Sequence, residues 1–508
     1  MERSPRRMCQ RPSWLHDPVA EIMKRSLRDV LVLVCCVGCR DGLAPVNDRP
    51  SVSNVAVAAN PTNVLSAIVT CSVGSVDSVR VRFAGSDGDT GATPFARPNA
   101  GRARIVLLGL QPSARYSLVV EAVGPGGSAS LPDSVATAAL PSAIQSLHLR
   151  GTGRPSSSYT LVVPILGDTT SGADGYVVIF DGAGDVRWYR AFPNLWPIEA
   201  KQQRNGNLTV YVGRSFGWQP VDGHYEEIAA DGAVTRTFAT APPLYTDPHE
   251  LLLSFADSGG STLAAVHMLG YELQTFDLSA LGGARDALLA AHTIERQNAA
   301  GSTVFRWRSL DHFDAQDWAA GVPLIPDIDH PSSLALDRDG NYIVSFQGLD
   351  EITNIDAVTG AIRWRFGGRH SQFRIIGDPL GGFSGQHHAQ MLENGHLLLM
   401  DNHIRTRGPA RAVEYALDLQ AMTATMVWEY RPSPGVVSMS MGSVQRLGNG
   451  ATLVGFGAAG RVAEVGGGVV TWSATLVADA GGVGTAVPFY RAVGVPSLYG
   501  YAPAVRQR

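Results

Sequence analysis

A recurring pair of local patterns restricts the fold of this chain more than any other feature of its sequence. An Asn-Gly or Asp-Gly dipeptide precedes an apolar run at four places, which are Asn205-Gly206, Asp339-Gly340, Asn394-Gly395 and Asn449-Gly450. Glycine accepts the positive φ of a tight hairpin, so each dipeptide predicts a turn between antiparallel strands. In the second pattern a strand-like run ends in a large aromatic residue, at Trp188, Phe238, Trp307, Trp364, Trp428 and Trp472.

The spacing of these aromatic residues indicates a repeat of several strands. Successive aromatics lie 44 to 69 residues apart, a period typical of β-propellers. The alternative is one large sandwich of two sheets, which does not require a repeated outer-strand aromatic. We therefore predict an all-β protein with a six-bladed β-propeller over residues 140–508. Only residues 286–300 read as a helix, which we expect to be an insertion between strands.

A smaller β-rich region precedes this repeat. Residues 51–139 contain short apolar runs separated by Gly, Pro and Asp, which predicts a β-sandwich. The segment around Tyr116 resembles the fibronectin type III pattern, with Tyr116 as its corner tyrosine. Cys71 is expected to be a lone buried strand residue. The region shows no catalytic constellation, so we expect a spacer or docking module, joined to the N-terminus by a linker over residues 40–50.

The N-terminal segment, residues 1–39, predicts an export signal. Basic residues within 24–28 precede the apolar run 30–34, which is too short to span a bilayer as a permanent helix. Met23 is a better start than the first methionine, because nothing before it is needed for a signal. The Gly-Cys pair at Cys39 also resembles a lipoprotein processing site. We expect a periplasmic, extracellular or membrane-anchored protein, with lipidation at Cys39 left open.

Charge and cysteine usage exclude two classes of function. The formal net charge is -4, and no long basic run follows residue 40, so we expect no nucleic-acid partner. No cysteine follows Cys71, which rules out a disulfide framework or a cysteine metal site in the larger region.

Three histidines precede apolar runs that we interpret as the inner strands of successive blades. They are His249, His330 and His387. Loops before inner strands form the mouth of a propeller channel, so these side chains are expected to converge on one axial site. Imidazole is a nucleophile and proton carrier near neutral pH, and it is also a common metal ligand. Nearby carboxylates could complete a metal shell or orient the rings: Asp247, Glu250, Asp327 and Asp329.

Several motifs resemble the bacterial arylsulfotransferase family, and the resemblance covers about residues 140–508. The matching segments are 339–345, 351–356, 359–364, Gly367-Gly368, Gln386-His387, Asp401-Asn402, 411–415 and 442–447. The resemblance implies transfer of a sulfuryl group from an aryl sulfate ester to a phenol, with small-molecule partners and neither a cofactor nor a metal. It also implies that His387 is the nucleophile that becomes sulfohistidine, and that His249 or His330 moves the proton.

The sequence also departs from the family pattern. An arginine that holds the sulfuryl oxygens in the family is replaced by Gln347, which offers an amide but no charge. Ser332 stands where the family has an asparagine. We take Gln347, Ser332, Asn402 and Arg411 as candidate substrate-binding residues, although Asn402 could serve turn chemistry and Arg411 could pair structurally with Glu414.

Two alternatives to the transferase interpretation remain open at this point. The first is a propeller that binds an anionic or glycan ligand without turnover, which Gln347 favours. The second is a metal-dependent hydrolase or lyase that uses the three histidines. The sequence leaves open whether the protein is a homo-oligomer.

Overall fold

The computed structural model describes residues 49–86, 88–167, 173–214, 223–279, 282–314, 317, 327, 329–405, 408–480 and 483–500. The predicted export signal, Cys39 and most of the predicted linker lie outside these residues. The described chain is all-β, and its helical content is three short 3-10 turns, η2 (Ser309–Asp311), η3 (Gln347–Leu349) and η4 (Gly457–Ala459). In this part of the chain, no helix is long and apolar enough to cross a membrane.

Two sheets precede the repeat. One has the order β1-β2-β5, built from β1 (Ser51–Ala59), β2 (Ala67–Gly74) and β5 (Arg102–Leu107). The other has the order β4-β3-β6-β7, built from β4 (Thr90–Ala92), β3 (Ser78–Gly85), β6 (Arg115–Gly124) and β7 (Gly127–Ala136).

One buried core joins these two sheets, because residues of both, such as Val69 and Val120, belong to the same apolar cluster. Cys71 is buried there without a disulfide. The backbone N–H of Gln111 donates a hydrogen bond of 2.9 Å to the Tyr116 hydroxyl, which fixes the chain where β6 begins.

Six further sheets follow in chain order. The first has the order β11-β10-β9-β34 and contains β9 (Tyr159–Pro164), β10 (Gly175–Asp181), β11 (Val186–Phe192) and β34 (Phe489–Val495). The second contains β12 (Trp196–Gln202), β13 (Leu208–Gly213), β14 (His224–Ile228) and β15 (Val234–Phe238). The third contains β16 (Tyr245–Phe255), β17 (Leu263–Phe276), β18 (Ala287–Asn298) and β19 (Thr303–Arg308).

The fourth sheet keeps the same four-stranded antiparallel pattern, and the fifth and sixth add strands to it, one of them parallel to its neighbour. The fourth contains β20 (Pro331–Leu336), β21 (Tyr342–Phe346), β22 (Glu351–Ile355) and β23 (Ile362–Gly367). The fifth contains β24 (Arg374–Ile376), β25 (His387–Met391), β26 (Leu397–Asp401), β27 (Arg411–Asp418) and β28 (Thr423–Tyr430). The sixth contains β29 (Ser443–Arg446), β30 (Thr452–Phe456), β31 (Arg461–Gly466), β32 (Val469–Ala480) and β33 (Val483–Ala486), with β8 (Leu147–Gly153) paired to β32.

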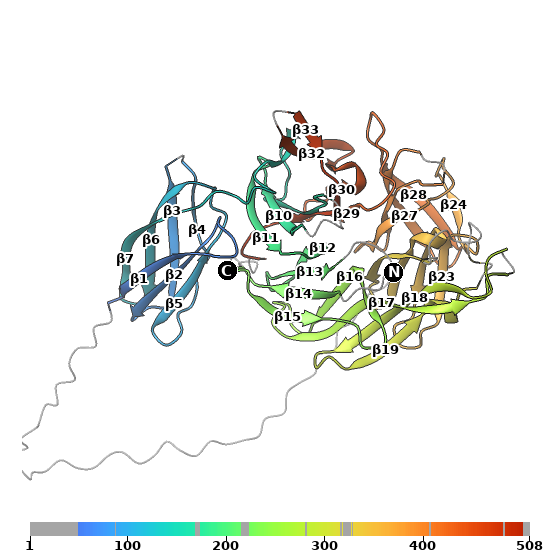
Figure 1. Cartoon of the computed structure of the whole chain (residues 1–508), viewed down its shortest axis with the longest axis horizontal. Coiled ribbons are helices and arrows are strands. Elements are labelled where there is room, and N and C mark those ends of the chain that lie inside the picture. The colour runs from blue at the N-terminus through green and yellow to red at the C-terminus, as the bar shows by residue number, and fades with distance from the viewer. Residues whose placement is uncertain are drawn as a thin grey trace, which may run out of the picture. The chain divides into compact units, whose positions relative to one another are not determined.

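One edge strand of each sheet contacts the corresponding strand of the next. The succession runs β12, β16, β20, β25, β29 and β34, and β34 contacts β12 again. Because β34 also pairs with β9, the end of the described chain completes a sheet formed near the start of the repeat. Figure 1 shows the sheets succeeding one another in chain order, in colours from green to red. This arrangement of four-stranded antiparallel sheets is consistent with a propeller.

The two sequence patterns of the repeat have clear structural roles. Gly206, Gly340, Gly395 and Gly450 all have φ between 82° and 87°, and each lies between two paired strands of one sheet, so the four predicted hairpins are confirmed. The six repeated aromatics lie on six different sheets, each on the fourth strand counted across its sheet from the contacting edge strand. Five of them are buried there, with Trp428 partly exposed.

The prediction of a helix over residues 286–300 is wrong. These residues form β18, which pairs with β17 from Ala265–Asn298 to Phe276–Ala287 and with β19 on its other side. Seven consecutive residues of β18 are buried, polar ones such as His292 and Glu295 among them. Burial on both faces leaves no alternation that would distinguish a strand from a helix by periodicity. The segment is therefore an interior strand of its sheet, not an insertion.

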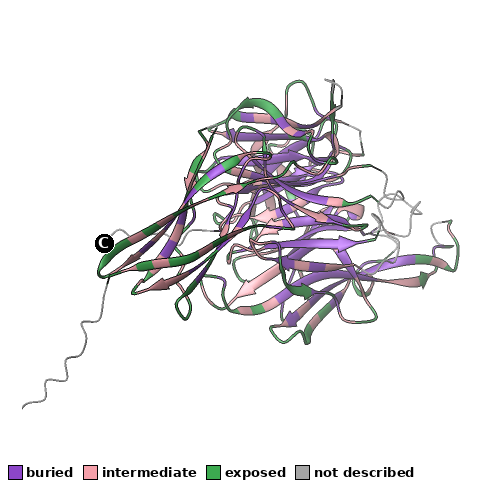
Figure 2. Cartoon of the chain, turned by 60° about the vertical axis from the view of Figure 1, so that its left-hand side comes forward, coloured by how far each residue is buried: buried purple, intermediate pink, exposed green. Residues whose placement is uncertain are grey.

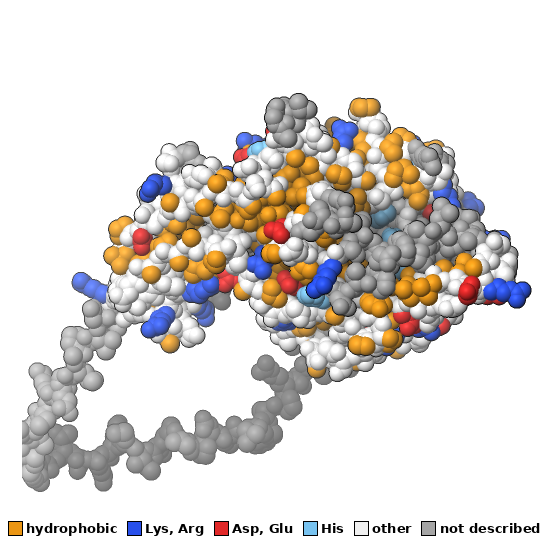
Figure 3. Space-filling model, in the orientation of Figure 1, with side chains coloured by type: hydrophobic (Ala, Val, Ile, Leu, Met, Phe, Trp, Pro, Cys, Tyr) orange, Lys and Arg blue, Asp and Glu red, His pale blue; other side chains and the backbone are white. Residues whose placement is uncertain are grey.

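Burial follows the middle of the strands. In Figure 2 the strand interiors are largely buried, while turns and strand ends are exposed. On the face shown in Figure 3, lysine and arginine side chains are dispersed among apolar and neutral groups.

Candidate active site

A cavity of about 190 Å³ collects side chains from several sheets. Its lining includes residues of β16 and β25 and the residue directly before β20, which are consecutive members of the contacting edge strands described above. The cavity is lined by Ile198, Asp247, Pro248, His249, Tyr271, Ala290, His292, Asp327, His330, His387, Ser440, Met441 and Tyr490. The structure thus brings together the three histidines that the sequence placed before successive strands.

Irregular strand pairing occurs where each of these histidines lies. The register of β16 shifts between Thr246 and Leu251, and that of β25 shifts between His387 and Gln390. His330 immediately precedes β20 and has a φ of 36°, in the left-handed region. Bulges and left-handed residues re-aim side chains at the ends of strands, so these three imidazoles can face one cavity instead of alternating with their sheets.

The His387 ring is held by oxygen acceptors on one side. Its Nδ1 lies 2.8 Å from Oδ1 of Asn402 and 3.0 Å from the carbonyl oxygen of Gly385. Because both neighbours are acceptors, the proton is assigned to Nδ1 and the lone pair to Nε2. Burial lowers the pKa of His387 to about 3, and the charge of nearby His330 acts in the same direction. His387 is therefore a neutral imidazole of fixed tautomer.

The backbone of Met441 approaches the other nitrogen of His387. Its N–H donates a hydrogen bond of 3.2 Å to Nε2, and Met441 has a φ of 60°. The amide of Asn402 helps to hold this segment, because its Nδ2 donates to the carbonyl oxygens of Ser438 and Met441 at 2.8 and 3.0 Å. Asn402 therefore connects the position of His387 to that of the facing loop.

His249 and His330 form a pair that lines the same cavity. Their ring centroids lie 4.7 Å apart with an interplanar angle of 76°. Nδ1 of His249 lies 2.8 Å from Oδ1 of Asp247, and Nδ1 of His330 lies 2.5 Å from Oδ2 of Asp327. Burial alone would lower the pKa of His330, but Asp327 outweighs burial and raises it. Each carboxylate directs the other ring nitrogen of its histidine away from itself.

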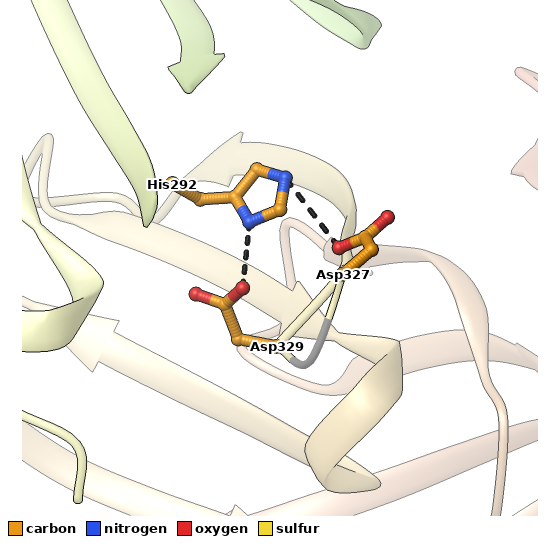
Figure 4. Close-up of side chains that lie close together, drawn as sticks. All are labelled: His292, Asp327 and Asp329. Atoms are coloured by element: carbon orange, nitrogen blue, oxygen red, sulfur yellow. Dashed lines mark hydrogen bonds and ion pairs between the residues drawn. The ribbon is translucent and has the colours of Figure 1, made fainter. Parts of the chain in front are cut away.

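A fourth histidine, His292 on β18, lines the same cavity. Three carboxylates surround it: its Nδ1 lies 2.6 Å from Asp329 Oδ1, and its Nε2 lies 3.6 Å from Asp327 Oδ1 and 3.8 Å from Asp247 Oδ2. Burial opposes the charged form, but Asp329, Asp327 and Asp247 together raise the pKa of His292 to about 10. Its place in the site, between Asp327 and Asp329 (Figure 4), was not predicted, because the sequence around His292 has the pattern of a helix and not of a strand.

The candidate substrate-binding residues do not line the cavity. Gln347 lies in η3, and its backbone N–H donates to the carbonyl oxygen of His330. Ser332 is fully buried and donates to Ser345 and to the carbonyl oxygen of Gln386.

Arg411 is also fully buried and away from the cavity. Its ion pairs are with Asp378, Asp401 and Glu429, at 2.8, 2.9 and 3.0 Å. Glu414, the partner suggested by the sequence, pairs instead with His396 and Arg446. Arg411 therefore joins β26, β27 and β28 and the segment that contains Asp378.

The remaining cavity wall is largely apolar, and among its described residues no lysine or arginine occurs. Arg491 lies behind the wall, where it pairs with Glu250 at 2.8 Å and donates to the carbonyl oxygens of His249 and Ser332. The guanidinium of Arg491 is thus paired within a buried network of ion pairs and hydrogen bonds that joins neighbouring strands.

These features define an all-β protein of successive four-stranded sheets, with a mainly apolar cavity into which four imidazoles and two carboxylates project. Comparison of the sequence with known families specifies this class further. The model of the family described as arylsulfotransferase (ASST) matches residues 219–474, which is half of the chain. The chain therefore belongs to the arylsulfotransferase family.

Other comparisons show only distant likeness. No curated protein matches the chain. Among solved structures, a Bacteroides caccae protein of unknown function is 13% identical over 66% of this chain and 98% of that one, with a TM-score of 0.40. A streptogramin B lyase is 10% identical over 65% of this chain and 88% of that one, with a TM-score of 0.34. Apo AztD from Citrobacter koseri is 12% identical over 82% and 98%, with a TM-score of 0.26. We draw no functional conclusion from TM-scores this low.

Proposed function

We propose that this protein transfers a sulfuryl group from an aryl sulfate ester to a phenolic acceptor, without a nucleotide donor, through a sulfohistidine at His387. Membership of the arylsulfotransferase family supports the class of reaction. The observation that carries the choice of nucleophile is the pair of oxygen acceptors on His387 Nδ1. They leave the lone pair on Nε2, at the cavity.

In the first step Nε2 of His387 attacks sulfur, the N–S bond forms, and the bond from sulfur to the phenol oxygen breaks. The hydrogen bond from the Met441 N–H to Nε2 has to part before this attack, and the freed N–H then lies close to the sulfuryl oxygens. A backbone donor at that position stabilises the charge that develops on them. Two easier steps thereby replace one direct transfer.

The leaving phenolate takes its proton from His330, whose pKa is raised by Asp327. In the second step the acceptor phenol returns a proton to His330 while its oxygen attacks sulfur and the N–S bond breaks. His249 lies against His330 and is itself held by Asp247, so it orients the pair within the cavity. A carboxylate that accepts from Nδ1 in this way stabilises the imidazolium that forms.

The apolar wall suits the aryl group. Ile198, Pro248, Ala290 and Tyr490 all line the cavity. An apolar cavity of about 150 Å³ accepts a benzene ring, so about 190 Å³ has room for one ring. The donor and the acceptor would then occupy the same space in turn, as a two-step transfer allows.

We extend the proposal to the architecture and location. The six contacting sheets correspond to a six-bladed propeller over residues 140–508, and the first two sheets correspond to a fibronectin type III-like module over residues 51–139. Export, with or without a lipid on Cys39, fits a reaction that needs no nucleotide. Secretion assays with Cys39→Ser would separate anchoring from release.

Trapping the intermediate tests the nucleophile. The protein is incubated with a chromogenic aryl sulfate without acceptor, quenched under alkaline conditions, digested and mapped by mass spectrometry. We expect a sulfuryl adduct on the peptide that contains His387, retained in His388→Asn and lost in His387→Asn. An adduct retained in His387→Asn would refute the assignment.

A ligand-binding protein without turnover is the second candidate, favoured by Gln347 and by the lack of a lysine or arginine among the described residues of the cavity wall. In that case the wild type binds an aryl sulfate in calorimetry but releases no phenol. Turnover that begins only in Gln347→Arg would support a protein that has lost its catalytic activity. Turnover by the wild type would exclude a ligand-binding protein without turnover.

A further inference from the structure

A basic groove lies on the sheet β1-β2-β5, which precedes the repeat; Figure 1 shows the three strands together. The groove has a volume of about 730 Å³. Three arginines line it, Arg97, Arg102 and Arg104, and no aspartate or glutamate of the described chain does. Cys71 and Ala103, which also border it, are buried. The exposed side chains of the groove are therefore all basic or polar.

Strand alternation places two of these arginines on one face. Along β5, Arg102 and Arg104 are exposed while Ala103 between them points into the core. Side chains two residues apart on a strand are about 7 Å from each other along it. On the neighbouring strand β2, Ser72 pairs with Arg102 and Thr70 pairs with Arg104. The sheet thus holds two guanidinium groups in a row beside two hydroxyl groups.

Two irregular segments complete the groove with amide groups. The register of β1 shifts where Asn54 has a φ of 50°, and Asn54 Nδ2 donates to Ser72 Oγ at 3.4 Å. Such a bulge re-aims a side chain. The backbone N–H of Asn99 donates to the carbonyl oxygen of Arg102 at 2.8 Å, and the N–H of Arg102 donates back at 3.0 Å. This turn keeps Arg97, two residues earlier, at the groove.

Most of the positive charge of the groove is not neutralised within the protein. Arg104 pairs with Asp231 at 2.8 Å. Among the described residues, neither Arg97 nor Arg102 has an acidic partner within ion-pair distance. A concave surface that carries charge of one sign raises the local concentration of ions of the opposite sign. The groove is therefore suited to an anionic ligand.

The other groups of the groove indicate which kind of anion fits. No aromatic side chain of the described chain lines it, so it lacks the platform on which single-stranded nucleic acids stack their bases. It also lacks the exposed apolar side chains that enter a lipid surface. Guanidinium groups bind carboxylates and similar oxyanions through paired hydrogen bonds, and amides and hydroxyls bind sugar hydroxyls. An acidic polysaccharide offers both kinds of group.

We propose that the groove on β1-β2-β5 binds an acidic polysaccharide, in which Arg97 and Arg102 pair with the anionic groups while Asn54 and Asn99 contact the hydroxyls. This function is separate from the proposed transfer reaction, because no residue of the groove lines the histidine cavity. The groove holds the protein on an anionic glycan, and the cavity acts on small molecules. Glycan binding and turnover at His387 are measured separately, so either proposal can fail alone.

Calorimetry of the full chain tests the groove directly. At low ionic strength the protein is titrated with a sulfated heparin oligosaccharide, with a carboxylated polygalacturonate oligosaccharide, and with a neutral dextran oligosaccharide of similar length. We expect saturable binding of at least one acidic oligosaccharide, one molecule per chain, which weakens as salt screens the charges. The dextran oligosaccharide should not bind. Lack of binding by both acidic oligosaccharides would overturn the proposal.

Charge-reversal variants locate the binding. Arg97→Glu and Arg102→Glu are each expected to weaken binding at least tenfold. The matched control is Arg115→Glu, which makes the same change of charge at an exposed residue on β6 in the other sheet and should weaken binding less than threefold. All three side chains are exposed, so the variants should keep the unfolding temperature of the wild type. An equal loss in Arg115→Glu and Arg102→Glu would mean that binding follows net charge and not the groove.

Other polyanions test the choice of a glycan. Vesicles of phosphatidylcholine and phosphatidylglycerol, and a single-stranded oligonucleotide, are compared with the acidic oligosaccharide on the wild type and on Arg102→Glu. We expect the part of the binding that depends on Arg102 to be at least tenfold weaker for both of these than for the oligosaccharide. Vesicle or oligonucleotide binding that is equally tight and equally dependent on Arg102 would refute a polysaccharide as the ligand.

Discussion

Two histidines that line one cavity, His387 and His292, have opposite electrostatic environments. His387 Nδ1 faces uncharged oxygens, those of the Asn402 amide and the Gly385 carbonyl, and burial lowers its pKa to about 3. His292 is equally inaccessible, yet Asp329, Asp327 and Asp247 overcome burial and raise its pKa to about 10.

The difference shows that burial does not by itself decide the charge of an imidazole. Amide and carbonyl oxygens fix a tautomer without favouring a positive charge, whereas carboxylates stabilise the protonated, positively charged ring. The cavity thus holds one neutral imidazole, the proposed nucleophile, and one positively charged imidazole.

The largest effect is expected from removing the neutral imidazole. His387→Asn should lower kcat/KM for an aryl sulfate by at least about 1000-fold, because no second group on that side can form the covalent intermediate. Release of the chromogenic phenol measures it. His388→Asn changes the next residue, which does not line the cavity, and should keep most of the activity. Turnover of His387→Asn within tenfold of the wild type would count against the scheme.

Removing the imidazole of His292, which three carboxylates surround, should lower the free energy of unfolding more than removing the neutral imidazole of His387. His292→Gln leaves three buried carboxylates without their cation, which typically costs about 3–5 kcal/mol. His387→Gln removes hydrogen bonds of an uncharged group, at about 1–3 kcal/mol. Denaturant unfolding of both variants in the presence of chelator measures the difference, and equal losses would mean that the two environments are not electrostatically distinct.

Acid should destabilise the protein through its neutral buried histidines. Burial lowers the pKa of His387 and His388 to about 3 and that of His267 to about 4. Below pH 6.5 the unfolded chain binds protons that the folded state refuses. The free energy of unfolding should therefore fall between pH 6.5 and about 4, by on the order of 1 kcal/mol per pH unit for each histidine.

Unfolding curves from pH 7 to pH 4.5 check this slope. His267→Gln, which lies outside the cavity wall, should make the slope shallower because it removes one of the three groups. If the free energy of unfolding of this variant had the same pH dependence as that of the wild type, acid would destabilise the protein through groups other than His267.

The smallest effect is expected from giving His387 a carboxylate neighbour of the kind that surrounds His292. Asn402→Asp places a carboxylate on Nδ1, which should raise the pKa of His387 and move the acid limb of kcat/KM upward by about one pH unit. Asn402→Ala removes the amide without adding charge and should lower the rate without moving the limb. An acid limb of kcat/KM at the same pH in both variants would contradict the proposed effect of residue 402 on the pKa of His387.

The sequence predicted the repeat well because its signals are local. A glycine with positive φ at Gly340 or Gly395 reflects the needs of one turn, and an aromatic such as Trp364 marks one strand. The three histidines in β16, directly before β20 and at the start of β25 were found for the same reason, since each lies near the same place in its repeat.

Residues whose environment comes from distant segments could not be assigned in this way. The sequence predicted that Asn402 stabilises a turn or binds substrate. In the structure its hydrogen-bond partners are His387 and the carbonyl oxygens of Ser438 and Met441. Arg411 read as a partner of Glu414, but three other acidic residues surround it. Neither set of partners is visible in local spacing.

By itself the sequence determined an all-β chain of repeated strands, the family to which it belongs and the histidines that lie at or near the start of three of its edge strands. Only the tertiary structure decided that 287–298 is a strand and that His292 joins the cavity. Neighbouring strands supply the hydrogen bonds of β18 from both sides, and the carboxylates around His292 come from β16 and the segment before β20. Contacts of such long range leave no periodic trace in the sequence, so only the folded chain reveals them.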